Sequence, residues 1–194
     1  MQEIYGDLFD SVKADAICIT TNGFVNPQGA NTMGAGCAGR AKVLWPGIQL
    51  LLGHRIRTEG NRVHQLTSDG LALPCSMFGG WPNHVLPYHL VSFPTKPERV
   101  EAHHELVRHY QRRPGQESQE EDLGLPGWMA QSDLNLIQQS CSELKQLAVE
   151  KGWDSVVLPR PGCGKGGLDW EKVVKPTVSA YLDDRFYVID FKKE

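Results

Sequence analysis

The sequence lacks the features of a membrane protein and of a general nucleic-acid binder. Its net charge is −3, so no overall positive field attracts a polyanion, and any contact with nucleic acid must be local. The apolar runs are far shorter than a membrane span, and the N-terminus lacks the basic, apolar and small-residue layout of a signal peptide. We therefore expect a cytoplasmic protein without membrane contact.

The sequence also lacks a cysteine pattern. Its five cysteines are odd in number and scattered, and they form no C-x-x-C pair and no paired Cys/His spacing. Neither a disulfide framework nor a structural zinc site is therefore indicated. The seven histidines fall mainly on a polar helix and in loops. We expect no metal site and no cofactor.

The composition is that of one folded unit. The chain has 194 residues, of which 40% are hydrophobic, and this is enough for the core of a single domain. Residues 112–127 are charged, polar and interrupted by glycine and proline, which predicts a solvated loop insertion. We expect a single domain over residues 1–194 that carries this insertion.

Strand-like and helix-like segments alternate along the chain. Residues 15–21 form an apolar run typical of a strand covered on both faces, and Ser132 or Asp133 can cap an amphipathic helix that ends at Gly152. Further strands are predicted at 4–8, 63–66, 71–75, 89–94, 155–158 and 186–191, and further helices on either side of Pro46, over 98–110 and over 170–182 with a break at Pro176. This alternation predicts an α/β fold with a largely parallel sheet.

Two glycine-rich segments, residues 29–39 and 162–167, each follow a strand-like run and precede a helix. Glycines let backbone N–H groups converge on an anion, and the N-terminus of the following helix adds partial positive charge. A tight turn with close helix–sheet packing explains either segment alone equally well. Both segments would meet at the carboxyl edge of the sheet, so together they favour a ligand with two phosphates.

The common nucleotide-binding motifs do not fit the second segment. Residues 162–167 satisfy the Gly-x-Gly-x-x-Gly pattern, but that pattern belongs to the first strand–helix–strand unit, and here only one strand follows. Lys165 is followed by Gly166 rather than Ser or Thr, and Pro159 stands where a P-loop has its first glycine. A Rossmann dehydrogenase and a P-loop nucleoside triphosphatase are therefore not indicated.

An ordered set of motifs resembles the macrodomain family over nearly the whole chain outside the insertion. The motifs are Gly-Asp-Leu at 6–8, Thr-Asn at 21–22, Met-Gly-Ala-Gly at 33–36, Phe-Pro-Thr-Lys at 93–96 and Pro-Gly-Cys-Gly-Lys-Gly-Gly-Leu-Asp-Trp at 161–170. The resemblance implies a three-layer α/β/α fold with a mixed, largely parallel central sheet. The fourth motif and the Gly-Gly-Leu-Asp-Trp ending look most like the branch of terminal ADP-ribose glycohydrolases and of antitoxin macrodomains that remove ADP-ribose from DNA.

The resemblance implies a binding site for ADP-ribose. Asp7 would accept a hydrogen bond from the adenine amino group, as a carboxylate can, although a turn or helix-cap aspartate is the alternative interpretation. The pyrophosphate would contact the two glycine loops, and Asn22 would lie near the distal ribose. The predicted ligand-binding residues are Asp7, Leu8, Thr21, Asn22, Met33, Gly34, Ala35, Gly36, Cys37, Thr95, Pro161, Gly162, Cys163, Gly164, Lys165, Gly166, Gly167 and Leu168.

Two residues are candidates for catalysis. Lys96 matches the lysine that acts at the distal ribose in the glycohydrolase branch, where it could attack or polarise the anomeric carbon. Its spacing alone indicates a solvated surface lysine, and only the motif match favours catalysis. Asp169 is either a second catalytic carboxylate or the N-cap of the following helix.

The resemblance leaves several functions open. Gly166 stands where the protein-directed glycohydrolases carry an acidic residue, which disfavours release of ADP-ribose from protein carboxylates and leaves DNA-linked or free derivatives. The leading hypothesis is a hydrolase that removes ADP-ribose from a modified macromolecule, DNA or protein, or acts at the distal ribose. The alternatives are a non-catalytic ADP-ribose reader, an ADP-ribose phosphate phosphatase, and an interaction module that uses the insertion. No feature of the sequence specifies an oligomeric state.

Overall fold

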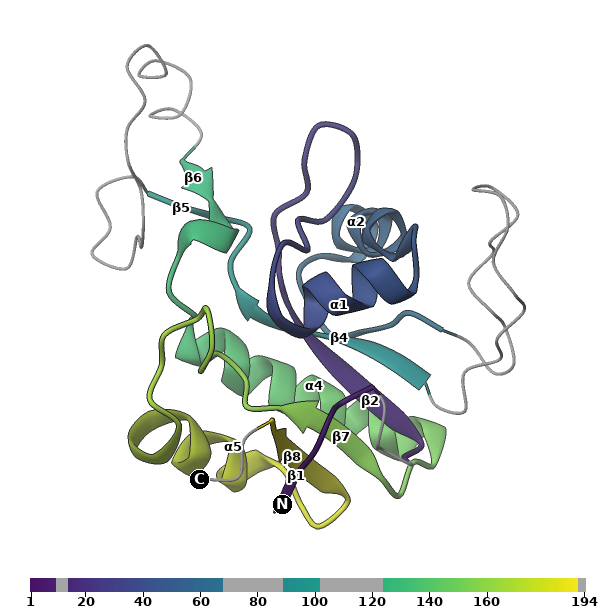
Figure 1. Ribbon diagram of the computed structural model, residues 1–194, viewed down its shortest axis with the longest axis vertical. Coiled ribbons are helices and arrows are strands. Elements are labelled where there is room, and N and C mark those ends of the chain that lie inside the picture. Colours follow the sequence, from purple (N-terminus) through teal and green to yellow (C-terminus); the bar gives the residue numbers. More distant parts are fainter. Residues whose placement is uncertain (10–13, 68–88, 102–123, 192–194) are drawn as a thin grey trace.

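The structure, a computed structural model, describes residues 1–9, 14–67, 89–101 and 124–191. Its centre is a six-stranded sheet with the strand order β1-β8-β7-β2-β4-β3 (Figure 1). Neighbouring strands are parallel, except that β3 and β4 are antiparallel. The strands are β1 (Gln2–Tyr5), β2 (Ala16–Asn22), β3 (His64–Gln65), β4 (His89–Lys96), β7 (Val156–Pro159) and β8 (Phe186–Asp190). The predicted mixed, largely parallel sheet is confirmed.

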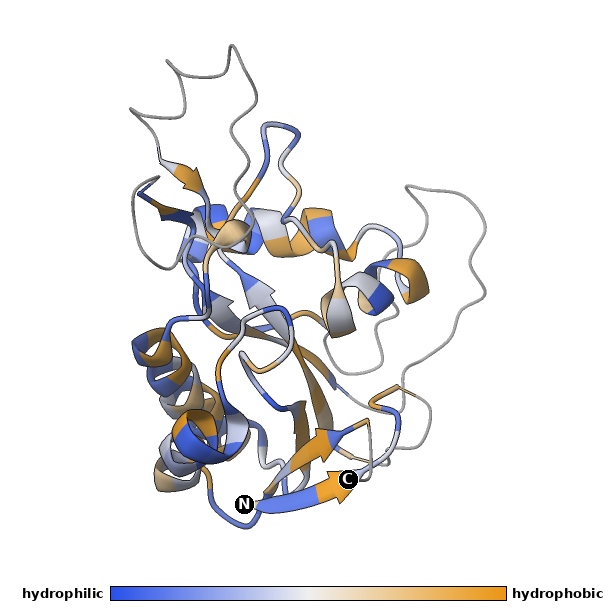
Figure 2. Cartoon of the chain, turned by 60° about the vertical axis from the view of Figure 1, so that its left-hand side comes forward, coloured by the Kyte–Doolittle hydropathy of each residue, from blue (hydrophilic) through white to orange (hydrophobic). Residues whose placement is uncertain are grey.

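Helices cover both faces of this sheet (Figure 1). One face carries α1 (Gly36–Leu44) and α2 (Ile48–Glu59), and the other carries α4 (Leu134–Lys151) and α5 (Lys175–Tyr181). Figure 2 shows apolar segments, in orange, in strands between helices that carry both polar and apolar residues. The three-layer α/β/α architecture is therefore confirmed.

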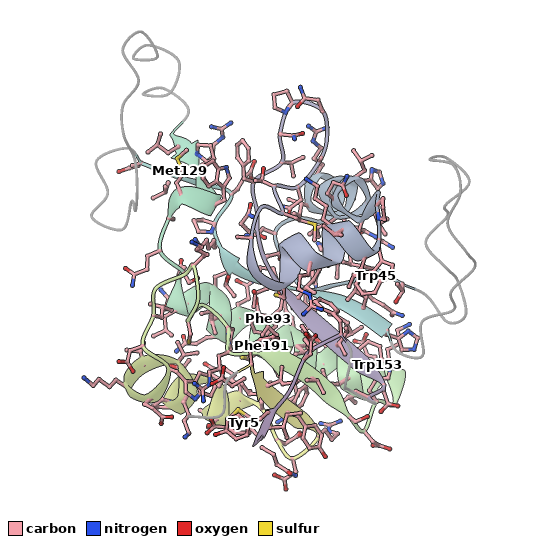
Figure 3. All side chains as sticks on the ribbon, viewed as in Figure 1. Tyr5, Trp45, Phe93, Met129, Trp153 and Phe191 are labelled. Carbon is pink, nitrogen blue, oxygen red and sulfur yellow. The ribbon has the colours of Figure 1, made fainter. Side chains whose placement is uncertain are left out.

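Each face of the sheet has its own hydrophobic core. Ile17 and Ile19 of β2 pack on the α1–α2 side, whereas Cys18, between them in sequence, packs on the α4 side. Successive side chains of a strand point to opposite faces, so the continuous apolar run of β2 supplies both cores. Phe93 of β4 is fully buried in the α4-side core (Figure 3).

The predicted cap residues of α4 function as caps. Asp133 Oδ1 accepts hydrogen bonds from the backbone N–H groups of Asn135 and Leu136, and Gly152 ends the helix in the left-handed conformation, with a φ of 66°. Both contacts satisfy backbone groups that the helix itself leaves unpaired. The predicted helix and its ends are confirmed.

The helix predicted over 170–182 is divided before Pro176, as expected. A π-helical segment, η3 (Trp170–Val174), leads into α5, with the proline in the first turn of α5. Proline lacks an N–H and is tolerated only where the helix needs no hydrogen bond from it. The effect predicted for Pro176, a kink or a split, thus appears as a change of helix type, with no non-helical residue between η3 and α5.

One predicted helix and one predicted loop are wrong where the structure describes them. The helix over 98–110 does not begin at residue 98, because Arg99–Val100 form β5 and pair antiparallel with β6 (Leu125–Pro126). The last residues of the predicted loop insertion are therefore ordered, and Leu125 is fully buried. A pairing of segments this far apart in sequence leaves no local pattern from which to predict it. The rest of that helix and of the insertion, and the strand at 71–75, lie outside the described residues.

Smaller differences concern where elements begin and end. β1 ends at Tyr5, so the motif around Asp7 lies in the loop after it, and β4 continues to Lys96. Pro46 does not open α2, because Gly47 caps that helix with a φ of 99°. A left-handed conformation at this position is available to glycine, and it turns the chain between α1 and α2.

Asp15, just before β2, connects that strand to β7. Its Oδ2 accepts hydrogen bonds from the backbone N–H of Asp154 (2.9 Å) and from both the N–H (2.8 Å) and the Oγ (2.9 Å) of Ser155. Burial of the carboxyl opposes its ionisation, but these bonds outweigh burial and hold the pKa of Asp15 below its usual value.

We expect Asp15→Asn to lower the free energy of unfolding at neutral pH by about 1 kcal/mol, an amount reduced by the exposure of the site. Because the pKa is lowered in the folded state, this stabilisation is present above the pKa of the unfolded chain and is lost as the pH falls through the folded value. Thermal unfolding of both proteins from pH 7 downward tests this. A difference that grows toward acid would contradict the assignment.

Candidate functional site

The carboxyl ends of the parallel strands define one edge of the molecule. From β2 the chain continues to β3 and β4 on one side of the sheet, whereas from β7 it continues to β8 on the other side. The adjacent strands β2 and β7 therefore form a topological switch point, the usual place for a ligand in an open α/β sheet. Both predicted glycine loops begin here, since residues 23–35 follow β2 and residues 160–169 follow β7.

The first loop ends at the N-terminus of α1. Met33 is buried in the core, whereas Gly34, Ala35 and Gly36 are exposed, and a Cβ added at either glycine would meet no atom within 4 Å. No side chain caps α1, and its first turn carries no acidic residue. An exposed backbone at an uncapped helix N-terminus has the geometry and the partial charge to hold an anion.

Cys37, in the first turn of α1, makes contacts that connect this helix to β2. Its Sγ lies 3.2 Å from both the backbone N and the Oγ1 of Thr20 on β2. Burial raises the pKa of the Cys37 thiol despite these contacts, so the thiol is not activated as a nucleophile. The contact joins the first glycine loop to the end of β2.

The second loop folds on itself through its own backbone. The N–H of Leu168 donates to the carbonyl of Gly162 (3.0 Å), and the N–H of Gly167 donates to that of Gly164 (3.1 Å). Gly162 and Gly167 have φ values of 76° and 73°, a conformation that glycine adopts without strain. Two of the backbone N–H groups that were expected to bind phosphate are thus used in hydrogen bonds inside the loop. The exposed part of the loop is at Gly164 and Lys165.

Gly166 lies on the inner side of this loop. A Cβ there would be 2.1 Å from Ser132 Oγ and 2.3 Å from the carbonyl oxygen of Gly162, both far below contact distance. The buried Ser132 also donates its backbone N–H to the Gly166 carbonyl (3.0 Å). No side chain fits at position 166, so packing requires glycine there.

Lys96, the last residue of β4, connects the second glycine loop to a neighbouring turn. Its Nζ donates to the carbonyl of Lys165 (3.2 Å) and to the carbonyl of Trp128 (3.1 Å) in the 3₁₀ turn η2 (Gly127–Met129). Figure 3 shows Met129 of this turn close to β6. The structure thus places Lys96 beside the predicted phosphate loop.

The other predicted residues at the ends of β2 and β4 stabilise the first loop. Asn22, which is 8% exposed, donates through Nδ2 to the Thr32 carbonyl (2.7 Å) and accepts the N–H of Phe24 (2.9 Å). Thr95 donates to the carbonyl of Thr21 (3.3 Å) and is buried. These side chains fix the backbone of the site, and a contact of Asn22 with a ribose stays a prediction.

Asp7 lies at the opposite end of the edge, in the loop after β1. Its Oδ1 accepts the N–H of Phe9 (2.9 Å), which is a turn contact, and its Oδ2 pairs with Arg40 Nη1 of α1 (2.5 Å). The adjacent Leu8 is buried in the core. Asp7 therefore stabilises a turn, and it also faces the helix whose N-terminus borders the first glycine loop.

Asp169 is a helix cap, as one of the two interpretations predicts. Its Oδ1 accepts the N–H of Lys172 (2.8 Å) at the start of η3. A catalytic role for this carboxylate stays a prediction. Two further predicted residues, Pro161 and Cys163, bond to each other through the Cys163 Sγ and the Pro161 carbonyl (3.5 Å).

Sequence reasoning missed three residues of this edge, namely Arg40, Phe9 and Ser132. Arg40 is 33 positions from Asp7, and Ser132 is 34 positions from Gly166. No local pattern marks either pair, because only the packing of α1 and α4 against the sheet brings them together.

Among the described residues, no group of three His, Cys, Asp or Glu side chains could hold a metal ion. No helix in this part of the chain has the length and apolarity to cross a membrane.

The strand order, the two helical layers and the loops at the switch point together define the macrodomain fold. The chain resembles the macrodomain of Mycobacterium tuberculosis DarG, with a TM-score of 0.60, 23% identity and 99% of each chain covered. It also resembles the Thermus aquaticus DarG macrodomain, with a TM-score of 0.58, 18% identity and coverage of 99% of this chain and 97% of that one.

A third similar structure is a Thermosipho africanus DarTG in complex with ADP-ribose, with a TM-score of 0.62 and 18% identity. All of this chain matches 43% of that longer one. No family model and no curated protein matches the sequence. The structural likenesses establish the fold.

Proposed function

We propose that this protein binds ADP-ribose along the carboxyl edge of its sheet and hydrolyses an ADP-ribosyl bond at the distal ribose. The observation that carries the proposal is the place of Lys96, whose ammonium group contacts the same glycine loop that the sequence predicts to hold phosphate. The adenine would lie at Asp7, the pyrophosphate between α1 and the loop at 162–167, and the distal ribose at Lys96. The DarTG that contains ADP-ribose has the same fold, which supports this choice of ligand.

The contacts of Lys96 favour an electrostatic role. Its Nζ donates to two carbonyl oxygens, and carbonyls bind the protonated ammonium as acceptors. A positive charge at the distal ribose would stabilise the negative charge that develops on a leaving oxygen when the glycosidic bond breaks. Attack by the lysine on the anomeric carbon would first require loss of this proton.

A non-catalytic reader is the second candidate, and a specific observation favours it. The inner position of the glycine loop, Gly166, has no room for a carboxylate, and Asp169 is used as a helix cap. Among the predicted site residues, Lys96 is thus the group best placed for chemistry. Turnover of ADP-ribosylated DNA, ADP-ribosylated protein and ADP-ribose phosphate separates these functions, because a reader binds ADP-ribose and turns over none of the three.

We expect calorimetry to detect one ADP-ribose site per chain, and Asp7→Asn to weaken binding about tenfold. The amide keeps an acceptor for the Phe9 N–H, but it replaces one carboxylate oxygen with a donor that cannot accept from adenine. Asp184→Ala, at a side chain that is 99% exposed, is the control and should leave affinity unchanged. Absence of ADP-ribose binding by the unmodified protein would refute the proposed function.

A further inference from the structure

Arg40 links the predicted adenine acceptor to an aromatic surface. Its Nη1 donates to Asp7 Oδ2, and its guanidinium carbon lies 5.1 Å from the centroid of the Phe9 ring. Phe9 packs edge-on against Trp45, with ring centroids 5.6 Å apart. Figure 3 shows Trp45 on the α1 side of the sheet. The guanidinium is therefore bound to a carboxylate and lies over an aromatic ring.

This arrangement fixes the direction of the Asp7 carboxylate. The terminal torsion of an aspartate is broad and has no single preferred angle. Here Oδ1 is held by the backbone N–H of Phe9, in the same loop, and Oδ2 by a planar guanidinium on α1. Because these two donors come from different elements, they set both the plane and the position of the carboxylate.

The guanidinium of Arg40 also presents a flat surface beside this acceptor. The guanidinium carbon lies over the Phe9 ring, and 45% of the side chain remains exposed. Planar guanidinium groups stack on aromatic ring systems, which a lysine ammonium cannot do in the same way. A purine that donates its amino group to Asp7 would thus have a stacking partner in the residue that orients Asp7.

We infer that Arg40 is a positioning residue that selects adenine at this end of the site, an inference that rests on the proposed ADP-ribose function. An exocyclic amino group donates to the oriented carboxylate. Hypoxanthine has a carbonyl oxygen in the same place, which sets an acceptor against the carboxylate, so that no hydrogen bond forms between them. Discrimination between the two bases depends on a carboxylate that cannot rotate away, and Arg40 supplies that constraint.

The test compares the affinities of ADP-ribose and of inosine diphosphate ribose, which carries hypoxanthine, by calorimetry. We expect the unmodified protein to prefer ADP-ribose about tenfold or more. Arg40→Met should weaken ADP-ribose about tenfold and the hypoxanthine ligand far less, so that the preference largely disappears. Arg40→Lys keeps the positive charge but lacks the planar guanidinium. Its preference for ADP-ribose should lie between that of the unmodified protein and that of Arg40→Met.

Arg55→Met is the matched control. Arg55 also pairs with a carboxylate, that of Glu59, and its side chain is 44% exposed, but it lies on α2 away from Asp7. Thermal unfolding of the arginine variants verifies that each is folded. Binding and base preference in Arg55→Met should equal those of the unmodified protein.

The possible results separate this inference from the proposed function. If the unmodified protein binds ADP-ribose and Arg40→Met keeps the same affinity and base preference, the positioning role inferred for Arg40 is wrong. The proposed ADP-ribose function is then unaffected. Tighter ADP-ribose binding by Arg40→Met would also overturn the inference, because Arg40 would then compete with the base for Asp7. If the unmodified protein binds neither nucleotide, the proposed function fails and the inference fails with it.

Discussion

Replacing Lys96 with alanine is expected to reduce turnover of the substrate about a hundredfold or more, while ADP-ribose still binds. The ammonium lies beside the glycine loop at the proposed distal ribose, and loss of one preorganised donor to a developing negative charge commonly costs a factor of this size. Initial rates on ADP-ribosylated DNA, ADP-ribosylated protein and ADP-ribose phosphate, together with calorimetry, measure the two effects separately.

The control for this experiment is Lys145→Ala. Lys145 is a half-exposed lysine on α4 whose Nζ pairs with Asp183, and neither residue belongs to the proposed site. Its turnover should therefore stay near that of the unmodified protein. Equal rates for Lys96→Ala and the unmodified protein would remove Lys96 from the chemistry. Tight ADP-ribose binding with no turnover of any of the three substrates would identify a reader.

Gly166→Ala is expected to destabilise the protein by about 3 kcal/mol, a fall of roughly 6–12 °C in Tm, and to weaken ADP-ribose binding. The new methyl group would lie 2.1 Å from Ser132 Oγ and 2.3 Å from the Gly162 carbonyl oxygen. The second of these is backbone and cannot rotate away, so the glycine loop must change shape. The loop backbone that is proposed to bind the pyrophosphate would be displaced as well.

Gly164→Ala is the control within the same loop. A Cβ at Gly164 meets no atom within 4 Å, and its φ is not in the positive range. Thermal unfolding should therefore show a small loss of stability for Gly164→Ala and a large loss for Gly166→Ala. Similar stability of the two variants would contradict the packing described for Gly166.

The same packing bears on the chemistry. An acidic residue introduced at position 166 would require displacement of Ser132 and of the loop backbone. The packing around the loop thus excludes a carboxylate at position 166. This favours a mechanism that depends on the Lys96 ammonium over one with a second acid in the loop.

Several elements could be predicted because their signals are local. Asp133 and Gly152 bracket an amphipathic repeat, and each end is stabilised by contacts within a few residues, so α4 appears as predicted. The break at Pro176 follows from the covalent structure of proline. β2 was recognisable as a buried strand because both faces of the sheet demand apolar residues from it.

Other features depend on contacts between distant segments. The pairing of β5 with β6 replaces the start of a helix that the composition of residues 98–110 favours, since strand pairing across a long connection can override local propensity. In the same way, Asp7 meets Arg40 only because α1 packs near the loop after β1. Positions 164 and 166 are both glycine, and only the folded structure, which places Ser132 and the Gly162 carbonyl beside Gly166, distinguishes them.

The sequence by itself determined the alternation of strands and helices, the two cores that β2 must serve, and the glycine-rich backbone of the two loops. These follow from hydrophobic periodicity and from the conformational freedom of glycine, which are properties of neighbouring residues. Only the tertiary structure decided that Lys96 contacts the second loop, that Arg40 orients Asp7 and that Gly166 admits no side chain. These depend on distances between elements, which are set when the helices pack on the two faces of the sheet.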